Sequence, residues 1–211
     1  MNVARVYEIA GMIPVIDRSA FVHPDAVIIG DVVIGPGCYI GPCACIRGDF
    51  GRIEIGTGVN IQDNCVVHSF PEVTVRIADD SHIGHGAVIH ACEIKRNALI
   101  GMNSVIMDRA VIGENAFVAA MAFVKAGMQV EPNTLVAGMP ARMVRTLSAQ
   151  ELEWKIQGTD SYKQLAVRSI NSLRPVEPLE VEEPGRKATD ELSAAPMPLT
   201  DIKNRTPSEP D

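Results

Sequence analysis

The chain has 211 residues, of which 46% are hydrophobic and only 4% aromatic, and its formal net charge is −7. This length predicts one well-buried domain with a modest appendage. The acidic balance, without a run of Lys and Arg, argues against a nucleic-acid-binding protein. No apolar stretch reaches about 18 residues and no secretion signal is visible, so we expect a cytoplasmic protein that does not bind membranes.

An aliphatic residue recurs every six positions through most of the chain. The repeat comprises Val22, Ile28, Ile34, Ile40, Ile46, then Ile55, Ile61, Val67, then Ile77, Ile83, Ile89, and finally Ile100, Ile106, Ile112, Val118 and Val124. An α-helix would spread such a repeat around its circumference, and the strict alternation of a β-sandwich is absent. The period therefore predicts a β-solenoid built from short strands.

Glycine follows several of these aliphatic residues, for example at Gly84 and Gly101, where we expect it to provide conformational freedom at turns. The period breaks near residues 47–54, 68–76 and 93–99. Extra or missing residues at these breaks should leave the solenoid as loops or short excursions. Such loops beside a rigid wall are where functional sites tend to lie.

The repeat resembles that of hexapeptide-repeat proteins, whose left-handed parallel β-helix places three hexapeptides in each triangular coil; the handedness is implied by this resemblance alone. We predict an all-β domain of this type over residues 1–140. Residues 141–174 are predicted to form one or two helices packed along the solenoid, because Ser148 and Glu151 make a capping box. Residues 175–211, rich in proline and charge, are predicted to be an extended or disordered tail.

The repeat predicts where several histidines lie on the solenoid. His68 and His90 both follow a repeat residue and are separated by one coil plus a short excursion, so they should stack on adjacent coils. Arg47, one coil earlier, should continue this ladder. His85 lies on the neighbouring face and would reach the pair only from a second chain. Three imidazoles with an open fourth position would form a catalytic metal site of the zinc type.

Two other histidines have a simpler interpretation. A single histidine at a turn is usually solvated or hydrogen-bonded to its neighbours, and we expect this for His23 and His82. No GxSxG motif is present, and no cysteine lies in an activating context. Covalent catalysis by serine or cysteine is therefore disfavoured.

Longer motifs resemble a known family. The segment "RGDFGRIEIGTGVNIQDNCVVH" (47–68), followed by "HIGHGAVIH", resembles the gamma-class carbonic anhydrase family of trimeric left-handed β-helix proteins. The segments "GMNSVIMD", "VAAMAFVKAG", "ELEWKIQGT" and "EPGRK" resemble its subgroup that contains the phenylacetic acid degradation thioesterase and the carnitine-operon hexapeptide protein. The resemblance extends to about residue 187. It implies a homotrimer with Zn²⁺, or alternatively Fe²⁺ or Co²⁺, bound by His68 and His90 of one protomer and His85 of its neighbour.

The resemblance and the residue chemistry together give four candidate catalytic residues. We expect Gln62 to orient the nucleophile, and Arg47 or the metal to stabilise an oxyanion. Asp49 is a further catalytic candidate. Tyr162 resembles a tyrosine of the C-terminal helix that faces the metal in related proteins, although a packing or capping role is nearly as well supported.

Two more residues are assigned to the interface or to structure, namely Asn60 and Asp63. Asp63 falls on the wall that carries His85, so it should pair with Arg47 of the next chain. Simple surface or interface pairing explains Arg47, Asp49 and Asp63 as well as direct catalysis does. Both can hold together, because interface charge pairs also orient ligands.

Three functional hypotheses follow. The first is a metal-dependent thioesterase that hydrolyses acyl-CoA substrates in aromatic-acid catabolism, such as phenylacetate degradation, with metal-bound hydroxide as the nucleophile. The second is a gamma-type carbonic anhydrase, although the short stretch "SFPEV" after His68 offers only Glu72 in place of that family's proton-shuttling loop. The third is a hexapeptide acyltransferase, which commonly uses a single histidine base, or a non-catalytic accessory protein of the carnitine pathway.

Overall fold

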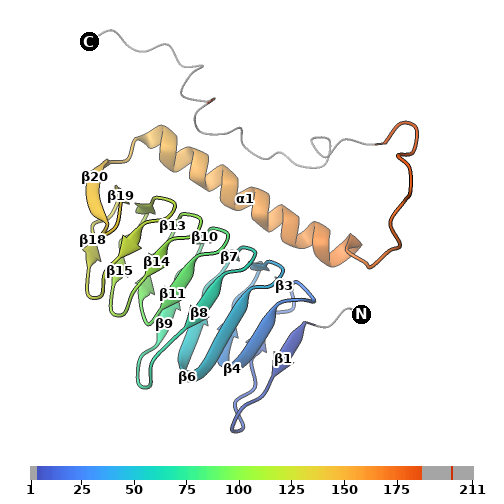
Figure 1. The fold of residues 1–211 in the computed structure, drawn as a ribbon, viewed down its shortest axis with the longest axis horizontal. Coiled ribbons are helices and arrows are strands. Elements are labelled where there is room, and N and C mark those ends of the chain that lie inside the picture. The colour runs from blue at the N-terminus through green and yellow to red at the C-terminus, as the bar shows by residue number, and fades with distance from the viewer. Residues whose placement is uncertain (1–3, 187–200, 202–211) are drawn as a thin grey trace.

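A computed structural model describes residues 4–186 and residue 201 of the chain. Short parallel strands stack into a three-sided solenoid, and one long helix runs along its length (Figure 1). The predicted hexapeptide-repeat β-helix with a C-terminal helix is confirmed. Among the described residues no helix has the length and apolar character needed to cross a membrane.

The solenoid has three faces, which we name by what lies outside them. The apolar face consists of β1 (Arg5–Tyr7), the first parts of β4 (Val27–Ile34) and β6 (Cys45–Ile55), β8 (Val66–His68), β11 (Val88–His90), β14 (Val105–Ile106) and β17 (Phe123–Val124). The charged face consists of β2 (Val15–Ile16), the second parts of β4 and β6, β9 (Val75–Ile77), β12 (Glu93–Ile94), β15 (Val111–Ile112) and β18 (Gln129–Val130). The helix face consists of β3 (Phe21–Val22), β5 (Tyr39–Ile40), β7 (Asn60–Ile61), β10 (His82–Ile83), β13 (Leu99–Ile100), β16 (Phe117–Val118), β19 (Thr134–Ala137) and the antiparallel β20 (Arg142–Thr146).

The six-residue repeat forms the core. Repeat residues such as Ile40, Ile61 and Ile83 lie in register on successive coils and have no exposed surface. Burying each such side chain stabilises the fold by about 1.5–3 kcal/mol. The low aromatic content follows from this arrangement, because stacked aliphatic side chains already fill the interior.

The glycines after the repeat residues have a different cause from the one expected. Gly101 does not adopt a positive φ, but a Cβ built there would lie 2.4 Å from the backbone nitrogen of Ala120 on the next coil. A Cβ at Gly84 would lie 2.8 Å from the Ile100 carbonyl oxygen of the following coil. Close approach of coils therefore requires glycine there. Left-handed turn positions are occupied mostly by other residues, such as Asn97 and Asn115, which tolerate positive φ.

The three breaks in the repeat, each predicted to form a loop or short excursion, differ in the structure. The extra residues of 47–54 remain within the continuous strand β6, and those of 68–76 form the excursion between β8 and β9. The prediction of a loop at 93–99 is wrong, because β12 follows directly and the coil continues. The shortening by one residue is absorbed at Ala91, whose φ is 45°.

A single helix, α1 (Ala149–Ser172), follows the solenoid. The predicted capping box is present: the Ser148 side chain accepts a hydrogen bond from the Glu151 backbone, and the Glu151 carboxylate accepts one from the Ser148 backbone. Residues 142–146 are not helical but form β20, which the sequence analysis missed. Residues 173–186 have no helix or strand, and most of the predicted tail lies outside the described residues.

The three faces differ in the side chains that point outward. Helix α1 covers the helix face along the row Phe21, Tyr39, Asn60, His82, Leu99, Phe117 and Leu135. The charged face carries Glu54, Arg76 and Glu93 in register. The apolar face carries the row Val27, Cys45, Val66, Val88, Val105 and Phe123, one residue from each coil. From Val27 to Phe123 this row has no charged member, and Arg5 of β1 precedes it in register. Within the part of the chain that the structure describes, no helix covers the row.

Candidate functional site

A histidine pair lies at one edge of the apolar face. Arg47, His68 and His90 occupy paired positions on three successive coils, as the spacing predicted. His68 Nδ1 lies 3.3 Å from His90 Nε2. The other ring nitrogens contact carboxylates, since His68 Nε2 is 3.1 Å from Asp49 and His90 Nδ1 is 2.5 Å from Asp108.

These contacts constrain the protons of the pair. If each neutral ring donates its N–H to its carboxylate, the two nitrogens that face each other both carry lone pairs. Two lone pairs at 3.3 Å repel unless a cation, either a proton or a metal ion, lies between them. The arrangement is therefore suited to hold a cation, and the carboxylates Asp49 and Asp108 orient the rings as outer-shell groups do in metal sites.

His85 lies apart from this pair, at the opposite edge of the same face. Its ring is half exposed, and its Nδ1 is 2.6 Å from the Asp63 carboxylate. In the part of a single chain that the structure describes, no three His, Cys, Asp or Glu side chains are placed to hold a metal. The three-histidine site across two chains thus stays a prediction, and so does the pairing of Arg47 with Asp63 of the next chain. Within one chain Arg47 contacts Asp49.

A buried polar group lies behind His85 on the helix face. The Gln62 amide nitrogen contacts Asn60 Oδ1 at 3.1 Å and His82 Nε2 at 2.7 Å, and its oxygen accepts a hydrogen bond from the His85 backbone. Burial lowers the pKa of His82 to about 3, so that ring is neutral and its Nε2 acts as the acceptor. Within one chain the Gln62 side chain is thereby engaged with Asn60, His82 and the His85 backbone. Its role in orienting a nucleophile stays a prediction.

Two details complete this polar group. Among the buried side-chain nitrogens and oxygens of the described residues, only Asn60 Nδ2 lacks a hydrogen-bond partner. The Tyr162 ring packs against Tyr39 at 5.5 Å and His82 at 5.4 Å, and burial raises the pKa of Tyr162 to about 12. In a single chain Tyr162 thus packs on the side of the helix that faces His82, and its predicted position facing a metal stays a prediction.

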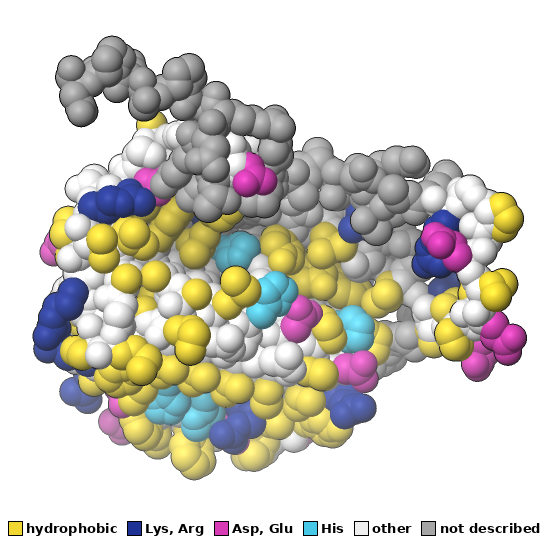
Figure 2. Space-filling view, turned by 45° about the horizontal axis from the view of Figure 1, so that its top comes forward, with side chains coloured by type: hydrophobic (Ala, Val, Ile, Leu, Met, Phe, Trp, Pro, Cys, Tyr) yellow, Lys and Arg dark blue, Asp and Glu magenta, His cyan; other side chains and the backbone are white. Residues whose placement is uncertain are grey.

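An apolar groove leads away from this group. It has a volume of about 320 Å³, and α1 contributes Trp154 to its wall. The solenoid contributes His82 and Gly84 at one end and Leu135 at the other, with Met102 between them. Figure 2 shows histidine side chains set among hydrophobic side chains on this side of the molecule. The buried thiols of Cys38 and Cys65 have pKa values raised to about 12 and about 11, which agrees with their non-catalytic assignment.

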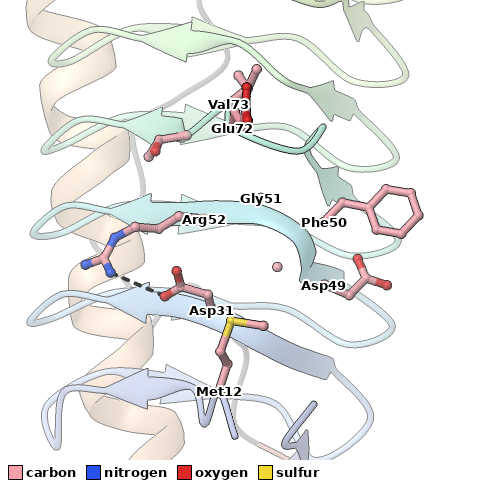
Figure 3. A pocket seen from close by; sticks show the side chains of 10 residues that line it. Met12, Asp31, Asp49, Phe50, Gly51, Arg52, Glu72 and Val73 are labelled. Carbon is pink, nitrogen blue, oxygen red and sulfur yellow. Dashed lines mark hydrogen bonds and ion pairs between the residues drawn. The ribbon is translucent and has the colours of Figure 1, made fainter. Parts of the chain in front are cut away.

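The excursions of the solenoid carry exposed aromatic rings. Phe50 lies 5.5 Å from the His68 ring, and Phe70 lies 4.8 Å from the His90 ring. In Figure 3 the Phe50 ring points away from the ion pair of Asp31 with Arg52, which occupies a neighbouring cavity of about 290 Å³. Sequence reasoning missed Phe70 and Asp108. Asp108 could have been found, because it follows His90 by one coil in the quoted segment "GMNSVIMD".

Several known proteins are similar to this chain. The model of the bacterial transferase hexapeptide family, with six repeats, matches residues 13–48 and 91–126. The carnitine operon protein CaiE of Salmonella agona is 49% identical over 189 residues, which cover 88% of this chain and 96% of that protein. CaiE of Escherichia coli K12 (DH10B) is 51% identical over 180 residues, or 85% of this chain and 92% of that protein. The chain belongs to the CaiE family of hexapeptide-repeat proteins.

Solved structures support the same relationship. A hexapeptide transferase family protein from Anaplasma phagocytophilum has 37% identity and a TM-score of 0.75, and the match covers 77% of this chain and 96% of that one. A putative acetyltransferase from Bacillus cereus has 38% identity and a TM-score of 0.76, covering 77% and 95%. Membership in the CaiE family confirms the expected resemblance to the carnitine-operon hexapeptide protein. These matches do not show the expected relationship to the gamma-class carbonic anhydrases.

The leading functional predictions need correction. The prediction of a hydrolase that acts on thioesters in phenylacetate catabolism is wrong, and so is the alternative prediction of a carbonic anhydrase. The matched relatives are CaiE proteins, and the matched structures are described as transferases. Part of the error has a physical cause. A metal site of the predicted kind does not by itself select the nucleophile, so it does not distinguish hydrolysis from acyl transfer.

Proposed function

We propose that this CaiE family member is an acyltransferase that takes its acyl group from a coenzyme A thioester and passes it to a hydroxyl or amine acceptor. The observation that carries the proposal is the His85–Asp63 pair, whose histidine is half exposed and directly follows Gly84, a lining residue of the apolar groove. Asp63 fixes Nδ1 as the protonated nitrogen, which leaves His85 Nε2 as a base. The related putative acetyltransferase supports this reaction class.

The reaction follows from this geometry. His85 Nε2 removes the proton of the acceptor hydroxyl or amine as its oxygen or nitrogen attacks the thioester carbonyl carbon. The tetrahedral intermediate collapses, the carbon–sulfur bond breaks, and the imidazolium of His85 returns the proton to the thiolate. The products are free coenzyme A and the acylated acceptor. The apolar groove beside His82 and Gly84 suits the acyl chain or the pantetheine arm.

The proposal is tested by free-thiol release from a panel of acyl-CoA donors, with and without acceptors. Carnitine belongs in the acceptor panel because the relatives are carnitine operon proteins. We expect release to depend on an acceptor and the acylated acceptor to appear by mass spectrometry. Release that is equally fast without any acceptor, or none with any pair, would reject acyl transfer; the second result would leave a non-catalytic accessory protein of the carnitine pathway.

We further propose that three copies assemble through the apolar face. Its outward row has no charge from Val27 to Phe123. The two edges of the face differ: one carries His68 and His90, the other His85 and Asp63. Unlike edges favour a head-to-tail ring over a two-fold contact. Such a ring brings His85 of one copy to the histidine pair of the next.

Replacing Val66 tests this assembly. Val66 lies at the centre of the row and is 38% exposed, so V66D places a charge in the interface without disturbing the core. We expect the wild-type chain to sediment as a trimer and V66D as a monomer with an unchanged circular dichroism spectrum. R76D, on the charged face, is the matched control and should remain trimeric. A wild-type monomer, or a trimeric V66D, would reject this face as the interface.

A second candidate is a divalent metal centre formed by His68 and His90 with His85 of the next copy. The 3.3 Å between the facing nitrogens fits two ligands of a tetrahedral ion, which at bond lengths of 2.0–2.1 Å lie about 3.4 Å apart. When bound, the ion would polarise a carbonyl oxygen. This candidate and the base mechanism assign different tasks to His85, so metal binding decides between them.

Metal binding is measured without activity. Under the metal candidate, the Co²⁺-loaded protein should show the visible absorption of a four-coordinate site, with one ion per chain by elemental analysis. H68A and H90A should abolish this absorption, while H23A should retain it, because His23 lies at another turn beside Asp25. Stoichiometric binding that survives H85A would show that His85 is not a ligand. No binding by the wild-type chain would reject the metal centre.

A further inference from the structure

A second cavity opens beside the histidine pair, on the outer side of the solenoid edge. It has a volume of about 560 Å³, and its walls come from the excursion after β8 and from the turns that follow β11, β14 and β17. The residues that carry the argument are Phe70, Asp108 and Arg109. Asp108 also contacts His90, so the cavity begins beside the histidine pair, to which the proposed ring of copies brings His85 of the next copy.

One wall of this cavity is the aromatic ring of Phe70, which lies at the surface. Phe70 is 45% exposed, yet its ring is fixed by a perpendicular contact with the His90 ring at 4.8 Å. Pro71 and Val73 flank it in the same excursion. A fixed and exposed aromatic ring is a surface on which a large, weakly hydrated cation binds well.

The charges of the cavity are of both signs. Asp108 supplies a carboxylate that is partly buried. Arg109 is exposed, and its side chain makes no ion pair or hydrogen bond with the part of the chain that the structure describes. Its φ of 57° places it at the corner of a coil, where the backbone is held by a hydrogen bond to Ala91. A guanidinium that is positioned and unpaired is suited to a carboxylate, which it binds through two parallel hydrogen bonds.

We propose that this cavity binds a small zwitterion that carries a quaternary ammonium group and a carboxylate. The ammonium group would lie against Phe70 and near Asp108, and the carboxylate would lie on Arg109. As the acyl acceptor, such a ligand would present a hydroxyl between its two charged ends, beside His90; this role rests on the proposed function. The binding itself does not, since it depends only on Phe70, Asp108 and Arg109.

Three ligands test the cation-binding part and the carboxylate-binding part of this site separately. L-Carnitine has both charged groups, choline has only the quaternary ammonium group, and 3-hydroxybutyrate has only the carboxylate. Isothermal titration of the full chain should give the highest affinity for carnitine. F70L keeps an apolar side chain but removes the aromatic face, so it should weaken both carnitine and choline by about two- to thirty-fold. R109Q should weaken carnitine and 3-hydroxybutyrate by about ten-fold or more, and leave choline unchanged.

Two control variants match these changes. F50L removes the other exposed phenylalanine, which also contacts a histidine but lines a different cavity. R142Q removes another exposed arginine, on β20. Both should keep the wild-type affinity for carnitine. Carnitine binding that F70L leaves unchanged would overturn the proposal. Coenzyme A is titrated in the same way, and an R109Q variant that weakens coenzyme A but not carnitine would also overturn it, because Arg109 would then bind a phosphate.

Failure of this proposal is distinct from failure of the proposed function. Binding of carnitine is measured without a donor, and turnover is measured with acceptors of every class. Acyl transfer to other acceptors without carnitine binding would reject the zwitterion site alone. Carnitine binding without any acyl transfer would reject the acyltransferase and keep the site.

Discussion

Replacing His85 with alanine is expected to lower kcat/KM for acyl transfer by about 100-fold to 10,000-fold, the usual contribution of a general base. The loss has a defined cause, because among the described histidines only His85 has one ring nitrogen within hydrogen-bond distance of a carboxylate while the other ring nitrogen has no partner. His23 Nδ1 instead accepts a hydrogen bond from the Asp25 backbone. Both nitrogens of His68 and His90 are engaged, and His82 is buried and bonded to Gln62. Thiol release with the best donor and acceptor measures the effect.

The controls for this variant use a second histidine and the orienting carboxylate. H23A removes a histidine that also lies near an aspartate, Asp25, and should leave turnover unchanged. D63N should lower turnover less than H85A does, because the base remains but its tautomer is no longer fixed. Full activity in H85A would remove the proposed mechanism. Metal content measured on the same samples shows whether any loss arises from a lost ligand instead.

The fold was predictable because one physical rule acts on every coil. Each coil buries one aliphatic side chain at each repeat position, so the period of Ile40, Ile61 and Ile83 is visible without any tertiary knowledge. The glycines were assigned to the right positions for the wrong reason. The requirement at Gly101 comes from the backbone of the next coil, which is a contact between residues distant in sequence. Strand β20 was missed because its pairing partner, β19, is antiparallel and outside the repeat.

The site was predictable only where it follows the register of the solenoid. The stacking of His68 on His90 follows from their spacing, and so does the separation of His85 from both. The contacts of His68 with Asp49 and of His90 with Asp108 depend on side-chain rotamers, which the spacing does not determine. Likewise, Phe70 belongs to an excursion outside the period, so no repeat position marked its contact with His90.

Lys155 carries the second large expected effect, on stability. This side chain is 1% exposed, and its ammonium group donates hydrogen bonds to the Asp80 carbonyl, to Asn97 Oδ1 at 2.8 Å and to Thr159 Oγ1 at 2.9 Å. Asn97 in turn begins a ladder, since its amide donates to Asn115 at 2.7 Å. Lys155 thus connects α1 to the turns of the solenoid.

K155M is expected to lower the free energy of unfolding by about 3 kcal/mol or more, because it leaves buried acceptors without a donor at about 1–3 kcal/mol each. The matched control is K95M, which removes a half-exposed lysine paired with Glu93 on the charged face. Such a surface pair contributes about 1 kcal/mol or less. Urea unfolding followed by circular dichroism measures both variants. Equal midpoints for K155M and K95M would contradict the assigned connection.

The same lysine gives the stability a definite pH dependence. Burial lowers the pKa of Lys155 to about 7 in the folded chain, whereas an unfolded lysine titrates near 10.4. Between these values the unfolded state binds more protons, so the free energy of unfolding rises with pH by up to about 1.4 kcal/mol per unit. K155M lacks this contribution. The difference in the free energy of unfolding between wild type and K155M should therefore grow from pH 7 to pH 9. A difference that stays constant would mean that its three acceptors keep Lys155 charged in the folded chain.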